Sequence, residues 1–172
     1  METSYESIEG RPALRLERRI AHPVAAVWTA ITDKQELSRW FPSTVDGELR
    51  RGERLRFEFV EHPDVPDMEG EVTDVEEQRL LAFYWGEDHL RFELEPAGEG
   101  ETDLRMTVLL GTEAKAARDG AGWTVCLARL EAALDGAGEQ ALERIDGGWR
   151  EHYDEYSRRG FPATAPVPES AS

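Results

Sequence analysis

The fold of this chain is decided by residues 22–41, HPVAAVWTAITDKQELSRWF. Pro23 suits the first turn of a helix, because the N–H group that proline lacks has no intrahelical partner there. The apolar residues that follow keep the i, i+3, i+4, i+7 spacing of one helix face: Val24, Val27, Trp28 and Ile31. This part of the stretch therefore predicts a first short helix.

The second half of the stretch predicts another short helix. Asp33 is a typical N-cap residue, and Glu36 follows three positions later, as in a capping box. The next apolar positions, and the proline that ends the helix, come directly afterwards: Leu37, Trp40, Phe41 and Pro42. Two short helices in succession are thus expected.

Strands are expected on both sides of these helices. Residues 13–20, ALRLERRI, place apolar side chains on one side at period two, interrupted by Arg18, and predict a first strand. Residues 1–12 are polar and are expected to form an N-terminal tail. From about residue 43 to 110 the period is again two, and turn signals separate six further strands: GELR, ERLRFEFVE, MEGEVTDVE, RLLAFYW, HLRFELEP and TDLRMTVLL. Apolar and charged side chains alternate, which is typical of an antiparallel sheet with one face covered.

The last third of the chain is helical. Trp123, Leu127 and Leu130 mark the apolar face of a long helix, with Asp119 as its expected cap and Gly136 as its expected stop. An additional C-terminal helix is expected at residues 137–159, with Trp149, Tyr153 and Tyr156 along one side. Residues 160–172 are rich in Pro, Ala and Ser and are expected to be a disordered tail.

The composition of the 172-residue chain argues against some classes of binding partner. Its 36 acidic and 20 basic residues give a formal net charge of −16, which repels nucleic-acid phosphates and anionic lipids. We therefore expect neither nucleic acid nor a membrane as a partner. One cysteine and four scattered histidines show no zinc-type spacing, so no metal and no organic cofactor is expected. The start has no secretory signal, so this acidic protein is expected in the cytoplasm.

The order of elements, one strand, two short helices, six strands and a long helix, carries a family resemblance. Residues 27–32 (VWTAIT), 37–41 (LSRWF), 70–72 (GEV, before RLLAFYW) and 122–123 (GW) resemble the START-like (SRPBCC, helix-grip) superfamily. Within it they resemble the homologues of the activator of heat-shock-protein-90 ATPase. The resemblance implies an α+β fold over residues 13–136, in which a curved antiparallel sheet of about seven strands holds the long helix on its concave face.

The resemblance also implies a cavity between the sheet and the long helix for a small apolar or amphipathic molecule. The alternation of apolar residues supplies the candidate wall: Trp40, Phe41, Phe57, Phe59, Leu81, Phe83, Trp85, Phe92, Met106, Trp123, Cys126, Leu127 and Leu130. The alternative is that these side chains simply fill the core. His89, at a turn near Trp85, is a candidate polar group at the cavity mouth and could serve as a general base. Its alternative is an exposed turn histidine.

Three functions are consistent with these patterns. The preferred one is non-catalytic binding of a small hydrophobic or amphipathic ligand, because no acid–base pair is recognisable on the apolar face. The first alternative is an enzyme resembling polyketide cyclases or dehydratases, with His89 as its polar group. The second is a chaperone accessory or protein-interaction module, in which Trp149, Tyr153 and Tyr156 contact a second copy or another protein.

Overall fold

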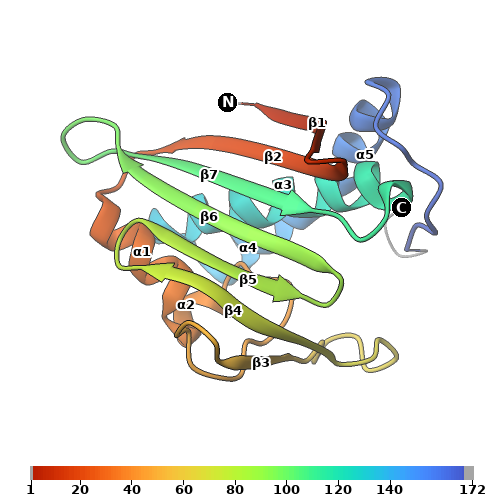
Figure 1. Cartoon of the computed structure of the whole chain (residues 1–172). Coiled ribbons are helices and arrows are strands. Elements are labelled where there is room, and N and C mark those ends of the chain that lie inside the picture. Colours follow the sequence, from red (N-terminus) through yellow and green to blue (C-terminus); the bar gives the residue numbers. More distant parts are fainter. Residues whose placement is uncertain (1, 169–172) are drawn as a thin grey trace.

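A seven-stranded antiparallel sheet forms the framework of the computed structural model, which describes residues 2–168. The strands are β1 (Thr3–Ile8), β2 (Arg11–Ile20), β3 (Arg54–Phe57), β4 (Met68–Glu76), β5 (Leu80–Trp85), β6 (Asp88–Pro96) and β7 (Thr102–Leu109). Their order across the sheet is β1-β2-β7-β6-β5-β4-β3. Figure 1 shows β1 and β3 at opposite edges, with the long helix α3 (Ala116–Leu134) behind the sheet. The predicted α+β helix-grip fold is confirmed.

Two short helices, α1 (Val24–Thr32) and α2 (Lys34–Leu37), connect β2 to β3, as the opening stretch predicts. The Asp33 carboxylate accepts hydrogen bonds from the backbone N–H groups of Gln35 and Glu36 at 3.0 and 3.1 Å, so it caps α2 as expected. The Trp40 indole donates to the carbonyl of Ala30 at 2.8 Å. This buried bond fixes the end of the second helix against the first.

The N-terminal segment differs from its prediction. Residues 3–8, expected to belong to a tail, form strand β1 and pair with β2 from Thr3↔Leu16 to Ile8↔Arg11. The turn between the two strands has positive φ angles at Glu9 (50°) and Gly10 (80°), the combination that a tight type I′ hairpin requires. The polar sequence TSYESI shows no clear apolar face, so its strand depends on this pairing rather than on its own pattern.

The other edge of the sheet also differs from its prediction. Residues 47–50, GELR, were expected to form a strand, but Gly47 adopts a φ of 119° and the segment is irregular, with bends at Gly47 and Arg50. The residues just before it are joined to β3 and its continuation by the isolated bridge Asp46↔Arg56 and by hydrogen bonds between Thr44 and Glu58. Strand β3 itself covers residues 54–57 rather than 53–61. The sheet still has seven strands because β1 takes the place of the strand expected at residues 47–50.

Helix α3 packs its apolar face on the sheet and ends where the sequence predicts. Gly136 has a φ of 84°, its N–H group donates to the Ala133 carbonyl, and the Ala137 N–H group donates to the Ala132 carbonyl. These two bonds form a Schellman motif, which satisfies carbonyl groups of the last turn. The start differs from the prediction: a short 3₁₀ turn (Glu113–Lys115) leads into the helix, and Asp119 lies in the first turn instead of capping it.

The C-terminal helix predicted at residues 137–159 is divided into α4 (Glu139–Asp146) and α5 (Trp149–Arg158). The break falls at Gly147 and Gly148, where glycine is unfavourable in a helix interior. Both helices pack against α3, mainly α5. Figure 1 shows α5 close to the β1 edge of the sheet.

The segment after α5 was expected to be disordered, but residues 160–168 pack against the domain. Phe161 is buried and stacks on Tyr156, with ring centroids 4.9 Å apart. The Pro162 carbonyl accepts from the Ala117 N–H group at 2.9 Å, and the Ala165 N–H group donates to the Ala114 carbonyl at 3.0 Å. One aromatic anchor therefore fixes a segment whose composition suggests disorder. Residues 169–172 of the predicted tail, and residue 1, lie outside the described residues.

Candidate functional site

The residues predicted to line a cavity come together between the sheet and α3. Strands β3, β5, β6 and β7 direct one side chain in two toward the helix, because successive side chains of a strand point to opposite faces. All members of the predicted set are buried except Phe59 and Trp85, which are half-buried: Trp40, Phe41, Phe57, Leu81, Phe83, Phe92, Met106, Trp123, Cys126, Leu127 and Leu130. The sequence pattern thus identifies one continuous apolar cluster.

Phe41 lies at the centre of the aromatic part of this cluster. Its ring centroid is 5.5 Å from that of Trp40, 6.0 Å from those of Phe83 and Trp85, and 5.7 Å from that of Trp123. Such tilted and edge-to-face contacts are favourable beyond the burial of apolar area, by roughly 0.5–1.5 kcal/mol per pair. We call these five residues the aromatic cluster.

One end of the aromatic cluster approaches the surface at Trp85. The indole N–H group donates to the Ser43 hydroxyl at 3.1 Å, and Phe59 packs against the ring at a centroid distance of 5.9 Å. Phe59 lies at the start of the loop between β3 and β4, in which Val60 and Val65 are 73 % and 43 % exposed. Trp85 therefore lies between the interior and a loop with two exposed valines.

Two surface hollows lie on the outer face of the sheet, which is the face turned away from α3. One has a volume of about 480 Å³ and is lined by residues of β3, β4, β5 and the turn before β3. The other, about 410 Å³, lies over charged residues of β2, β6 and β7. None of the predicted cavity residues lines either hollow. The rings of the aromatic cluster contact Phe41 at centroid distances of 5.5–6.0 Å, so a molecule bound among them would have to displace side chains.

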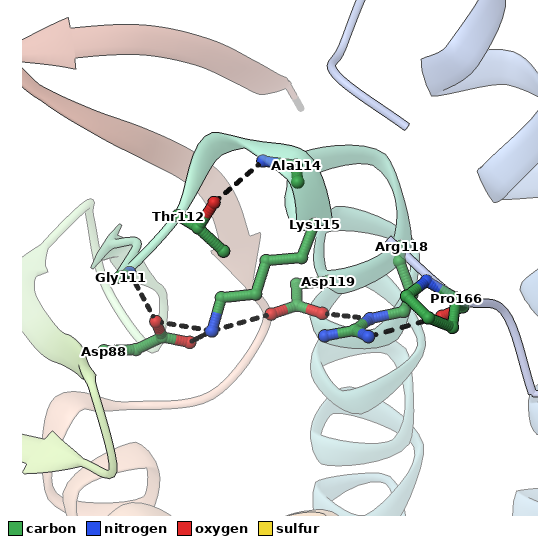
Figure 2. A network of polar contacts seen from close by, with 8 residues as sticks. All are labelled: Asp88, Gly111, Thr112, Ala114, Lys115, Arg118, Asp119 and Pro166. Atoms are coloured by element: carbon green, nitrogen blue, oxygen red, sulfur yellow. Dashed lines mark hydrogen bonds and ion pairs between the residues drawn. The ribbon is translucent and has the colours of Figure 1, made fainter. Parts of the chain in front are cut away.

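A buried polar network adjoins this cluster, at the start of α3 (Figure 2). The Lys115 ammonium lies 2.7 Å from the Asp88 carboxylate and 3.7 Å from that of Asp119. Asp88 also accepts from the Gly111 N–H group at 2.8 Å, and Arg118 donates to Asp119 at 2.8 Å. The Asp88 side chain is 2 % exposed and that of Lys115 14 %. Two carboxylates and two cations thus balance each other in a nearly closed site.

Both carboxylates of the polar network belong to residues that neighbour members of the aromatic cluster. Asp88 is the cross-strand partner of Trp85, and Asp119 precedes Trp123 by one helical turn. Burial raises the pKa of Asp119, while Arg118 and Lys115 oppose that rise. Sequence reasoning missed this network as a site. The i, i+4 spacing of Lys115 and Asp119 could have indicated an ion pair on one helix face. Asp88 is 27 residues away from Lys115, so no local sequence pattern connects it with the pair.

Cys126 is a buried member of the predicted set without nucleophilic character. Burial raises the pKa of its thiol to about 12. The thiolate is the reactive form of cysteine, so this side chain acts as a small apolar group at neutral pH.

The structure does not bring His89 to the aromatic cluster. His89 pairs with Tyr84 across β5 and β6 and points to the outer face, whereas its neighbours Asp88 and Leu90 point inward. Its Nε2 atom lies 2.9 Å from the Thr73 hydroxyl, and the Tyr84 ring contacts it edge-on at 4.9 Å. The histidine is thus half-buried on the face opposite to the predicted cavity.

The aromatic residues of the C-terminal region pack on their own domain. Tyr156 is buried, and its hydroxyl lies 2.7 Å from that of Thr124 on α3. Trp149 and Tyr153 stack with centroids 5.1 Å apart, and the Arg150 guanidinium lies over both rings. A large part of the surface predicted for a second copy or a protein partner is therefore occupied within the chain.

The curved sheet, the paired short helices and the long gripped helix define a START-like (SRPBCC, helix-grip) domain. Solved structures agree. A conserved protein of unknown function from Enterococcus faecalis has a TM-score of 0.71 at 20 % identity over 91 % of each chain. CalU16 from Micromonospora echinospora has a TM-score of 0.69 at 23 % identity, over 91 % of this chain and 96 % of that one. DynU16, a protein of the dynemicin biosynthetic locus, has a TM-score of 0.62 at 24 % identity, over 72 % and 47 %.

A more specific assignment comes from the sequence. The model of the family described as "Activator of Hsp90 ATPase homolog 1-like protein" matches residues 21–135, more than half of the chain. The chain therefore belongs to this family. None of the curated proteins matches it. Within residues 2–168, no helix combines the length and the apolar character needed to span a membrane.

Proposed function

We propose that this protein binds a small hydrophobic or amphipathic molecule between the sheet and α3, without transforming it. The observation that carries the proposal is the aromatic cluster, in which four rings surround Phe41 in one compartment. Ligand sites of this kind are mostly apolar and aromatic, with few polar groups that fix orientation. The Asp88–Lys115 pair beside Trp85 supplies such a polar end.

Access to this compartment is proposed at Trp85. The ring is half-buried, is held by one hydrogen bond to Ser43, and borders the exposed loop after Phe59. The interior rings are packed in the free protein, so ligand uptake requires a less populated open state. The apparent affinity is then reduced by the fraction of molecules that are open.

Native mass spectrometry after incubation with a cellular lipid extract tests this function. The expected result is a mass adduct whose ligand is released on unfolding, together with quenching of tryptophan fluorescence. Phe41→Leu should weaken the adduct, because it removes the central ring and keeps an apolar side chain. Trp149→Phe is the matched control, since this ring lies on α5 and contacts Tyr153 rather than the aromatic cluster. A folded protein that remains empty at every lipid load and pH would refute the proposal.

A second candidate function, an enzyme like the polyketide cyclases or dehydratases, is favoured by one observation. Asp119 is a carboxyl group of raised pKa one turn from Trp123, and proton donors in active sites are often tuned in this way. The neighbour DynU16 comes from a biosynthetic locus, which is compatible with such a role. A model poly-β-ketone thioester should then give a cyclised or dehydrated product with the wild type and little with Asp119→Asn. Equal product with both proteins would exclude Asp119 as the proton donor.

A further inference from the structure

A hydroxyl group and an imidazole meet on the outer face of the sheet, away from the proposed ligand compartment. The Thr73 hydroxyl lies 2.9 Å from His89 Nε2. Strand β4 carries a β-bulge between Val72 and Asp74, so the register against β5 shifts at Thr73. Bulges re-aim side chains and are frequent beside active sites. Here the bulge lets a hydroxyl from β4 reach a histidine of β6 across strand β5.

The surroundings of His89 favour its neutral form. Burial lowers its pKa, the guanidinium groups of Arg91 and Arg11 lower it further, and the carboxylate of Asp74 opposes them. Tyr84 also contacts His89, in an edge-on arrangement of the two rings. A neutral imidazole whose Nε2 accepts the Thr73 proton has the arrangement of a general base beside a hydroxyl nucleophile. The two guanidinium groups also place positive charge near His89.

A hollow on the same face lies beside Tyr84, although neither Thr73 nor His89 lines it. The hollow of about 480 Å³ on this face is lined by Tyr84, which contacts His89, and by Glu71, two residues before Thr73. Arg54 and Arg56 of β3 line its other side. A polar alcohol portion suits this hollow better than a long acyl chain, because charged side chains and one phenol surround it.

We propose that Thr73 and His89 form an acyl-transfer site that cleaves small carboxylic esters of polar alcohols. The Thr73 oxygen bonds to the ester carbonyl carbon, and its proton passes to His89 Nε2. The bond from that carbon to the alcohol oxygen then breaks, and the proton passes from Nε2 to the leaving alcohol. Water attacks the threonyl ester, giving its proton to Nε2, and the carboxylic acid leaves as Thr73 recovers its proton. Atoms balance with water as the only co-reactant.

p-Nitrophenyl acetate is the probe for this site. We expect release of p-nitrophenol to fall by about 100-fold or more in Thr73→Val and in His89→Gln, the usual contribution of a positioned general base. Thr73→Ser keeps the hydroxyl and should retain the activity. Peptide mapping of the quenched reaction should find the acetyl group on Thr73. The rate should decline as pH falls through the lowered pKa of His89, because the protonated imidazole cannot accept a proton.

His62→Gln is the matched control, since His62 is exposed in the loop between β3 and β4 and should leave the rate unchanged. Thermal unfolding of every variant shows whether the fold is kept, and Thr73→Ser decides the outcome if Thr73→Val does not fold. An acetyl group that maps elsewhere, or a rate unchanged in folded Thr73→Val, would overturn the proposal. The aromatic cluster plays no part in this reaction, so failure here leaves the interior ligand site to its own test.

Discussion

Gly70 lies in β4 where this strand passes the backbone of β5. A side-chain carbon added there would overlap the Tyr84 carbonyl oxygen and lie 2.9 Å from the Phe57 ring. Because the backbone must move, we expect Gly70→Ala to lower the free energy of unfolding by about 3 kcal/mol. Gly122→Ala is the control: its new carbon comes no closer than 3.9 Å to Trp149, and alanine favours a helix interior by about 0.8–1.0 kcal/mol. Urea unfolding of both variants checks the opposite signs.

Asp119 makes stability depend on pH. Its pKa is raised in the folded protein, so between its ordinary and its raised value the folded state binds more protons than the unfolded state. Stability from this group is therefore greatest at low pH and is lost as pH rises through that window. Relative to Asp119→Asn, the wild type should become less stable as pH rises from the ordinary pKa of an aspartate, about 4, through the raised pKa of Asp119, as urea unfolding at each pH would show.

Asp103 provides the control with the opposite sign. The hydrogen bond from Arg19 lowers the pKa of Asp103, so its contribution is present above the ordinary pKa and is lost as pH falls. Relative to Asp103→Asn, the wild type should gain stability as pH rises. If both variants showed the same trend, the assigned direction at Asp119 would be wrong.

At the scale of elements, the segment after α5 acts as a cap for α3. The first turn of α3 has no side-chain cap, and the Pro162 carbonyl accepts from its Ala117 N–H group instead. Phe161 anchors this segment between Tyr156 and Tyr5. We expect Phe161→Ala to cost about 3–5 kcal/mol and to speed hydrogen exchange at the Ala117 amide. Thr164→Ala, at an exposed position of the same segment, should change neither; normal Ala117 protection in Phe161→Ala would contradict the capping role.

Elements set by local patterns are the ones that the sequence predicts correctly. The two short helices, their Asp33 cap, the Gly136 stop and the alternating strands all depend on residues close in the chain. Strand β1 depends on pairing with β2 across a two-residue turn, and residues 160–168 depend on contacts with the distant start of α3. Composition alone suggests that both segments are unstructured. The site divides in the same way. Its apolar residues follow from periodicity, whereas the pairs Asp88–Lys115 and Thr73–His89 are made only by the packing of distant elements.

At the scale of the whole molecule, apolar and charged side chains lie on opposite faces of the sheet. Apolar rings are directed toward α3, and charged side chains pair on the outer face, as in Arg19–Asp103 and Arg105–Glu17. Exposed pairs of this kind contribute little to stability, with a median of about 0–1 kcal/mol. Most of the free energy of folding must therefore come from burial between sheet and helix. Ligand uptake at that place would compete with the packing that stabilises the fold.

This competition can be measured at Phe41, which is 6 % exposed and contacts four other rings. If the interior is filled, Phe41→Ala leaves a cavity and should cost about 3–5 kcal/mol by urea unfolding. Benzene should then raise the melting temperature of the variant and leave the wild type unchanged, because an apolar cavity of that size binds such molecules. Tyr84→Ala, on the outer face, should show neither effect. A cost well below this range, with benzene stabilising the wild type as well, would mean that the compartment is already open before any ligand binds.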